Sequence, residues 1–203
     1  CRADAQAEAI EELSTGTIKN IIDDIASDYT PILVLTGGEP LYRKDFFDIA
    51  GYAVAKGFPV ALATNGTLIT ESLAKEIHDT GIRRVSISID AGYAELHDSI
   101  RGIPGSFDNA LHGSELLREQ GVGFQFNITI TKRNVDELEK TLRIAEDKGA
   151  LAVHLFMLVP VGCGVNISES DMISKEKYEE VLEWLFDYSQ NTTMEIKATC
   201  APH

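Results

Sequence analysis

Apolar strand patterns alternate with helical patterns along almost the whole chain, and this alternation limits the fold more than any other feature. Short apolar segments that fit strands lie at residues 32–35, 60–64, 85–89, 124–130, 152–158 and 194–198. Amphipathic segments that fit helices lie at residues 17–27, 45–56, 70–80, 107–120, 135–148 and 175–188. Strands and helices that alternate in this way form a parallel sheet joined by right-handed crossovers. The sequence therefore predicts an α/β fold.

Residues at the ends of the helical segments support these boundaries. A glycine follows four of the segments, where a left-handed residue satisfies free carbonyl groups without a Cβ penalty: Gly57, Gly81, Gly121 and Gly149. Thr70 begins the segment at 70–80 and Asn134 stands directly before the segment at 135–148, so we predict that both are N-caps.

The parallel sheet could be an open, doubly wound sheet or a (β/α) barrel. The dinucleotide-binding pattern G-x-G-x-x-G follows no early strand, which argues against the open sheet. Six strands without an obvious reversal of order fit a partial (β/α)6, TIM-like barrel better. No linker or low-complexity segment interrupts the series, and the chain begins with Cys1 rather than methionine. We therefore expect residues 1–203 to be one domain, truncated at both ends.

The composition excludes several classes of partner. The formal net charge is −14 and the pI is about 4.7, whereas binding to nucleic acid requires clustered Lys and Arg. No apolar run approaches the roughly 18 residues that span a bilayer, and no signal peptide is visible. We expect a soluble, cytoplasmic protein without a nucleic-acid or membrane partner. Three scattered cysteines, Cys1, Cys163 and Cys200, are too few for a disulfide framework.

Polar residues follow the predicted strands where parallel α/β folds bind their ligands. The first strand ends in Thr-Gly-Gly-Glu-Pro, in which Gly37 and Gly38 let the backbone approach a ligand closely. Glu39 adds an acceptor suited to an ammonium group, and Pro40 stiffens the exit. A plain strand-to-helix turn is the alternative, and it accounts for every residue except Glu39.

Five strand ends together resemble the radical S-adenosylmethionine (radical SAM) enzymes. The motif carriers are "TGGEP", "ALATNGTL", "VSISID", "FNITITKRN" and "FMLVP", with "HDSIRGIPGSFDNAL" as the helix entry whose Arg contacts the SAM carboxylate. These segments cover essentially the whole chain in the order of that family. The resemblance implies a barrel that generates a 5′-deoxyadenosyl radical by reductive cleavage of SAM.

The resemblance also implies roles for individual residues. Gly37, Gly38, Glu39 and Pro40 would hold the SAM ammonium group, and Arg101 would hold its carboxylate. Ser88 and Asn127 would meet the ribose or the carboxylate, with Asn65 close by. Asp90 would face either the ribose or the substrate, and Leu158 would flank the adenine.

The cysteines differ from the family's Cys-x-x-x-Cys-x-x-Cys signature for a [4Fe–4S] cluster, because only Cys1 stands near the start. We interpret Cys1 as the third ligand, with the first strand and the first two cysteines missing. Cys200 resembles the first ligand of an auxiliary iron–sulfur domain of the SPASM type that would follow residue 198. Cys163 could pack or face the substrate, and its role stays open.

Longer matches resemble the haem-biosynthesis branch of the family. They are "TGGEPLYRKDFFDIA", "ALATNGTLI", "RRVSISIDA" and the closing "KATCAPH". The resemblance implies decarboxylation or side-chain removal on an iron tetrapyrrole, with ferredoxin or flavodoxin as electron donor. A radical SAM peptide-maturing enzyme is the main alternative. A barrel aldolase or isomerase without a cluster would need a Schiff-base Lys or paired carboxylates at the strand ends, and this sequence has neither there. A binding protein that keeps the fold without a cluster also remains open.

Two histidines are candidates for roles inside the fold. His97 precedes Arg101 by one helical turn, and we expect it to cap or pack rather than to catalyse. His154 lies within the segment at 152–158, where it could face the barrel interior.

Overall fold

The computed structural model describes residues 12–159 and 168–199, and its centre is a six-stranded parallel sheet. The strands are β1 (Leu33–Leu35), β2 (Val60–Thr64), β3 (Arg84–Ser88), β4 (Gly123–Ile130), β5 (Ala152–Met157) and β6 (Glu195–Thr199). They pair in chain order from β1 to β6 without a reversal. Each predicted strand is confirmed to within one residue at either end, and the unreversed order confirms the partial barrel over the open sheet.

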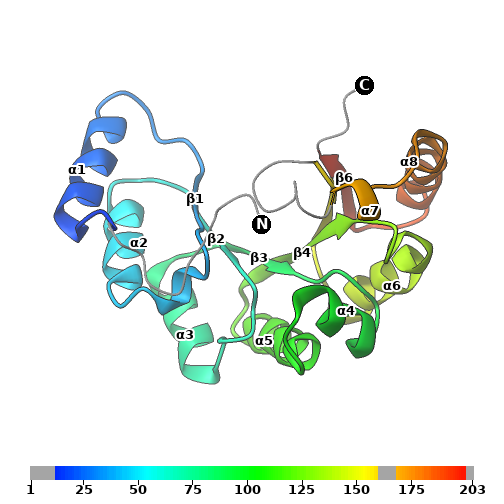
Figure 1. Cartoon of the computed structure of the whole chain (residues 1–203). Coiled ribbons are helices and arrows are strands. Elements are labelled where there is room, and N and C mark those ends of the chain that lie inside the picture. The colour runs from blue at the N-terminus through cyan, green and yellow to red at the C-terminus, as the bar shows by residue number, and fades with distance from the viewer. Residues whose placement is uncertain (1–11, 160–167, 200–203) are drawn as a thin grey trace.

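Helices cover one side of the curved sheet, as Figure 1 shows. The predicted helices are confirmed as α1 (Thr15–Ala26), α2 (Phe46–Ala55), α3 (Glu71–Thr80), α5 (Ser106–Glu119), α6 (Leu138–Lys148) and α8 (Lys175–Ser189). Four elements were not predicted: the 3-10 helix η1 (Pro40–Tyr42), α4 (Ala94–Arg101), the 3-10 turn η2 (Val135–Glu137), which was assigned to the helix of α6, and α7 (Ser168–Asp171). Among the described helices, none is long and apolar enough to cross a membrane.

The two faces of the sheet differ in chemistry because side chains alternate along each strand. The face toward the helices is apolar and buried, with Leu62, Ile87, Phe126 and Leu155 fully covered. The opposite, inner face is polar. The strand register aligns one inner row across four strands: Ser88, Asn127, His154 and Lys197. The core therefore lies between the sheet and its helices, and the inner row is left for a site.

The helix ends follow the predicted capping pattern with one exception. All four predicted C-terminal glycines have positive φ: Gly57 (91°), Gly81 (89°), Gly121 (73°) and Gly149 (80°). Thr70 caps α3 by accepting a hydrogen bond from the N–H of Leu73. Asn134 takes the N-cap position of η2, as predicted, but its side chain makes no capping hydrogen bond there.

Asn134 instead joins the ends of β3 and β4. Its side chain is fully buried, and its Nδ2 donates to the carbonyl oxygens of Asp90 and Thr129, each at 2.8 Å. Its Oδ1 accepts from the N–H of Thr131 at 2.8 Å. The pairing of β3 with β4 ends at Ser88 and Asn127, so these backbone groups lie past it and the amide satisfies them where the two strands diverge.

The variant Asn134→Ala tests this junction. Three buried backbone groups lose their partner, and we expect the free energy of unfolding to fall by about 3 kcal/mol. Urea unfolding measures the loss as a lower midpoint at unchanged slope. Asn191→Ala is the matched control, because Asn191 is exposed and donates one bond to the carbonyl of Asp187. A loss no larger than the control's would contradict this role.

A close approach between α5 and the loop after β2 also shapes the site. A Cβ at Gly113 would lie 2.6 Å from the carbonyl oxygen of Gly66 and 3.1 Å from the Cβ of Ile69. No side chain fits at that distance from backbone, so α5 reaches the loop only through a glycine.

Two helical glycines give a matched pair of variants. Gly113→Ala forces α5 away from the loop, and we expect it to lower the free energy of unfolding by about 1–3 kcal/mol. Gly16→Ala in α1 meets only Ser14 Oγ at 3.8 Å, so the better helix propensity of Ala should make it neutral or stabilising by up to about 1 kcal/mol. Thermal unfolding of both variants measures the contrast, and equal shifts would refute the packing argument.

Candidate functional site

The Thr-Gly-Gly-Glu-Pro turn fastens β1 to β2 through the carboxylate of Glu39. Glu39 Oε1 accepts from Thr64 Oγ1 at 2.7 Å and from the N–H of Leu41 at 3.2 Å. Its Oε2 accepts from the N–H of Asn65 at 2.8 Å. Glu39 has no ion-pair partner within residues 12–159 and 168–199. The carboxylate is thus held in place with its negative charge unmatched by any described cation.

The fold itself does not require a glycine at position 37. Gly37 is not among the residues with positive φ, and a Cβ there would meet no described atom within 4 Å. Pro40 begins η1, the position where a missing N–H costs nothing. The residues from Thr36 to Pro40 line a cavity of about 620 Å³ beside α1 and α2. The open space over Gly37 and the fixed charge of Glu39 together suit a ligand with an ammonium group.

Asn65 begins the loop at the end of β2. Its Oδ1 accepts from the N–H and the hydroxyl of Thr67, both at 2.8 Å, so the side chain stabilises the turn of the loop that it begins. Gly66 follows with φ of 81°, and a Cβ there would lie 2.7 Å from Ile87 Cγ2. The predicted pair Glu39 and Asn65 is therefore brought together, through the backbone N–H of Asn65.

Asp90 and Arg101 form a second pair of predicted residues in direct contact. The Asp90 side chain is 3% exposed, and its Oδ2 lies 2.7 Å from Nη2 of Arg101, which ends α4 and is 32% exposed. Asp90 Oδ1 accepts from the N–H of Thr129 at 2.9 Å. The carboxylate of Asp90 therefore holds the guanidinium of Arg101 against β4, and part of the guanidinium remains accessible.

His97 packs behind this ion pair, as the sequence predicted. It is 1% exposed, lies against the ring of Phe107, and its Nδ1 accepts from the N–H of Asp90 at 3.1 Å. Burial lowers the pKa of His97, which matches an imidazole that accepts a hydrogen bond. His97 is a buried packing and hydrogen-bonding residue.

Ser88 and Asn127 lie directly opposite each other on the inner face. Both are partly exposed, and Asn127 Oδ1 accepts from Nε2 of Gln125 at 3.1 Å. Leu158 follows β5 and donates its N–H to the carbonyl of Ile130 at 3.3 Å. The structure thus places most of the predicted cofactor residues at or after the carboxyl ends of β1, β2, β3 and β5. The exceptions are Asn127, which lies inside β4 opposite Ser88, and Arg101, which ends α4.

The predicted cysteines Cys1, Cys163 and Cys200 lie outside the described residues. Within the described ranges, no group of three or more His, Cys, Asp or Glu side chains could hold a metal ion. Sequence reasoning also missed Thr64, Gln125 and Asn134, which hold the predicted site residues in place. Thr64 ends β2, Asn134 was singled out only as a helix cap, and Gln125 lies inside β4 with no local signal of its role.

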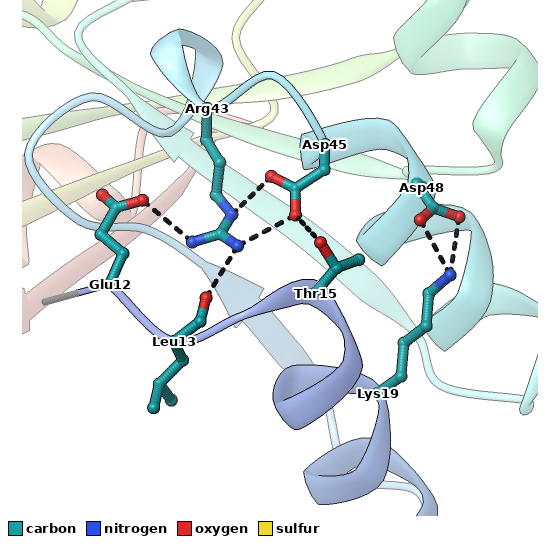
Figure 2. A network of polar contacts seen from close by, with 7 residues as sticks. All are labelled: Glu12, Leu13, Thr15, Lys19, Arg43, Asp45 and Asp48. Carbon is teal, nitrogen blue, oxygen red and sulfur yellow. Dashed lines mark hydrogen bonds and ion pairs between the residues drawn. The ribbon is translucent and has the colours of Figure 1, made fainter.

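Sequence reasoning also missed an ion-pair network, shown in Figure 2, that joins the start of α1 to the turn after η1. Arg43 Nη1 contacts Glu12 at 3.0 Å, its Nη2 donates to the carbonyl of Leu13 at 3.0 Å, and its Nε lies 2.7 Å from Asp45. Thr15 donates to the same carboxylate. The hydrogen bond from Arg43, aided by Thr15, lowers the pKa of Asp45 to about 2. Arg43 thereby fixes the chain before α1 against the Gly-Gly-Glu-Pro turn.

Comparison with known proteins identifies a family and relatives of this chain. The model of the Radical SAM superfamily matches residues 1–145. An AdoMet-dependent heme synthase of Methanosarcina barkeri is 46% identical over 192 residues, 95% of this chain and 54% of that protein. An Fe-coproporphyrin III synthase of the same organism is 37% identical over 180 residues, 87% of this chain and 45% of that protein.

A solved structure shows the same fold at low sequence identity. Streptococcus suis SuiB bound to the precursor peptide SuiA has a TM-score of 0.83 at 14% identity, covering 96% of this chain and 44% of SuiB. The chain spans about half the length of the curated relatives it matches. The matched model covers most of the chain, and the first relative exceeds 40% identity over nearly all of it. The chain belongs to the radical SAM superfamily.

Proposed function

We propose that this chain is the SAM-binding core of a radical SAM enzyme that removes carboxylate from an iron tetrapyrrole in haem biosynthesis. The observation that carries the proposal is the fixed carboxylate of Glu39, which pairs with no cation of the described residues, beside the open backbone of Gly37 in a chain of this family. Family membership implies SAM and a [4Fe–4S] cluster as cofactors. The described residues fit SAM, while the proposed cluster ligand Cys1 lies outside them.

Glu39 is proposed to accept the SAM ammonium group. Three protein donors hold its carboxylate in place. The SAM ammonium group would be the cation that pairs with it, through a charge-assisted hydrogen bond. Gly37 and Gly38 leave the backbone open for close approach, and Pro40 fixes the exit of the turn.

Arg101 is proposed to hold the SAM carboxylate. A guanidinium carries five N–H donors, and Asp90 engages only part of them. Asp90 was also predicted as a ligand itself. Since both of its oxygens already have protein partners, we propose that Asp90 contributes mainly by orienting Arg101.

The remaining predicted contacts extend along the strand ends. Ser88, Asn127 and Asn65 are proposed to meet the ribose or the carboxylate, and Leu158 to flank the adenine. Their support is their common placement at the carboxyl ends of strands or, for Asn127, directly opposite one, where ligands of parallel α/β barrels bind.

Cys1 is proposed to bind the cluster, and Cys200 to bind an auxiliary cluster in a domain that follows residue 198. When bound, the reduced cluster supplies the electron that cleaves SAM to the 5′-deoxyadenosyl radical, with ferredoxin or flavodoxin as its electron donor. The chain's own residues hold SAM in one orientation, which is the protein's main contribution to cofactor chemistry. No role is proposed for Cys163.

The tetrapyrrole substrate is favoured over a peptide by the pattern of relatives. Identities of 46% and 37% connect this chain to two proteins named for haem and Fe-coproporphyrin III synthesis. The peptide-bound SuiB shares the fold at only 14% identity, which carries no information on substrate. A radical SAM peptide-maturing enzyme, the alternative that the sequence left open, stays the second candidate.

Substrate turnover tests the proposal directly. The full-length protein, purified anaerobically with its clusters reconstituted, is incubated with SAM, dithionite and either Fe-coproporphyrin III or didecarboxysirohaem. We expect 5′-deoxyadenosine to form together with loss of carbon dioxide from one tetrapyrrole, measured by mass spectrometry. Formation of 5′-deoxyadenosine without tetrapyrrole turnover would overturn the haem assignment. No 5′-deoxyadenosine at all would overturn the enzyme assignment.

The variant Glu39→Gln tests the SAM site separately from the substrate. It keeps the size of the side chain but removes the charge that would face the ammonium group. A hydrogen bond to a charged group is worth about 1.5–3 kcal/mol, so we expect SAM affinity to fall about tenfold to a hundredfold. Anaerobic calorimetry measures the change, with exposed Glu71→Gln in the first turn of α3 as control. Equal affinity in both variants would rule out the ammonium contact.

A further inference from the structure

A buried amide lies between two polar side chains of the inner face. Gln125 is 8% exposed, and its Nε2 lies 3.1 Å from Asn127 Oδ1 and 3.0 Å from His154 Nδ1. Asn127 and His154 are direct neighbours across β4 and β5, and Gln125 lies two residues before Asn127 on the same face. One NH₂ group thus serves two acceptors.

The chemistry of these groups fixes their orientation. An amide NH₂ carries two hydrogens, and here one goes to each neighbour. The carbonyl oxygen of Asn127 is therefore taken by Gln125, which leaves its own NH₂ as the group available to a ligand. His154 must accept at Nδ1, so its proton is on Nε2.

The surroundings of His154 favour this neutral form. Burial is the largest cause that lowers the pKa of His154, and the positive charges of Lys197 on β6 and Arg84 on β3 lower it further. Glu195 on β6 acts in the opposite direction. A neutral imidazole that accepts from Gln125 is therefore the form expected at neutral pH.

A proton on Nδ1 of His154 would reverse the whole chain of hydrogen bonds. Gln125 would have to turn its Oε1 toward the new N–H, and that oxygen would then face the oxygen of Asn127. Asn127 would have to rotate and donate to Gln125, so it would offer an acceptor instead of a donor to the inner face. The three side chains therefore have two self-consistent arrangements, set by one proton.

We infer that Gln125 and His154 are positioning residues that hold Asn127 with its NH₂ toward SAM. The inference rests on the proposed function, which places Asn127 against the ribose or the carboxylate of SAM. A carboxylate can only accept hydrogen bonds, so the arrangement in the structure is the one that binds it. The opposite arrangement would set an amide oxygen against a carboxylate oxygen.

The isosteric variant Gln125→Glu forces the opposite arrangement without changing shape. A carboxylate donates nothing, so Asn127 must turn its NH₂ toward the introduced carboxylate and its oxygen toward SAM. We expect the dissociation constant of SAM for the full-length, cluster-reconstituted protein to rise about tenfold at neutral pH, the loss of one good hydrogen bond. Gln190→Glu is the matched control, the same exchange at an exposed residue after α8.

Variants of His154 change SAM affinity and its pH dependence in a way that a merely structural role of His154 would not. His154→Leu removes the acceptor and should weaken SAM binding severalfold, while His154→Asn, whose Oδ1 replaces Nδ1, should restore most of it. In the wild type, SAM binds the form with neutral His154, so affinity should fall as the pH drops through the pKa, which lies below 6.5. His154→Asn should lose that part of the pH dependence, which lies below about pH 6.5 because the pKa of His154 is lowered.

The outcomes separate this inference from the proposed function. If the wild type binds SAM and Glu39→Gln weakens it, but Gln125→Glu binds like Gln190→Glu, the positioning inference is overturned and the SAM site stands. If the wild type does not bind SAM, the proposed function fails. In a wild type that does bind SAM, NMR titration of His154 is a second test, in which a proton on Nδ1 in the neutral form would overturn the inference and a proton on Nε2 would support it.

Discussion

The buried carboxylate of Asp90 is the contact on which the geometry of the site depends. A charge out of water is costly unless it is paired and hydrogen-bonded. Asp90 meets this condition with Arg101 on one oxygen and the N–H of Thr129 on the other, while its own N–H and C=O are taken by His97 and Asn134. One residue thereby joins β3, β4, α4 and the loop before η2.

The position of Arg101 depends on these polar contacts because α4 packs weakly. Its only buried residue is His97, so little apolar area holds the helix to the sheet. A second carboxylate, Asp98, accepts from the N–H of Phe107 and from the hydroxyl of Ser106 at the start of α5. Asp90 on one side and Asp98 on the other fix the helix that presents Arg101.

Local patterns predicted the sheet and most helices because strand alternation and helix ends are read from neighbouring residues. The glycines that end the helices could be predicted without knowledge of tertiary contacts, whereas the role of Asn134 could not. Its capping pattern fits the local sequence, but the amide bonds Asp90, which lies 44 residues earlier, and that tertiary contact prevails. Helix α4 was missed for a related reason, since Tyr93 makes no side-chain cap and the apolar spacing is too sparse to signal a helix.

Some glycines of this chain are required by the fold itself, whereas Gly37 is explained better by a ligand. Gly66 has positive φ and tight neighbours, and Gly113 has backbone where its Cβ would be, so the fold itself requires both. Gly37 has neither restriction, yet it stands in a turn whose next charged residue, Glu39, is tied to the end of β2 by two hydrogen bonds. Turn chemistry cannot explain a glycine that the backbone does not need. A ligand that approaches the backbone there explains both the missing side chain and the carboxylate beside it, which pairs with no cation of the described residues.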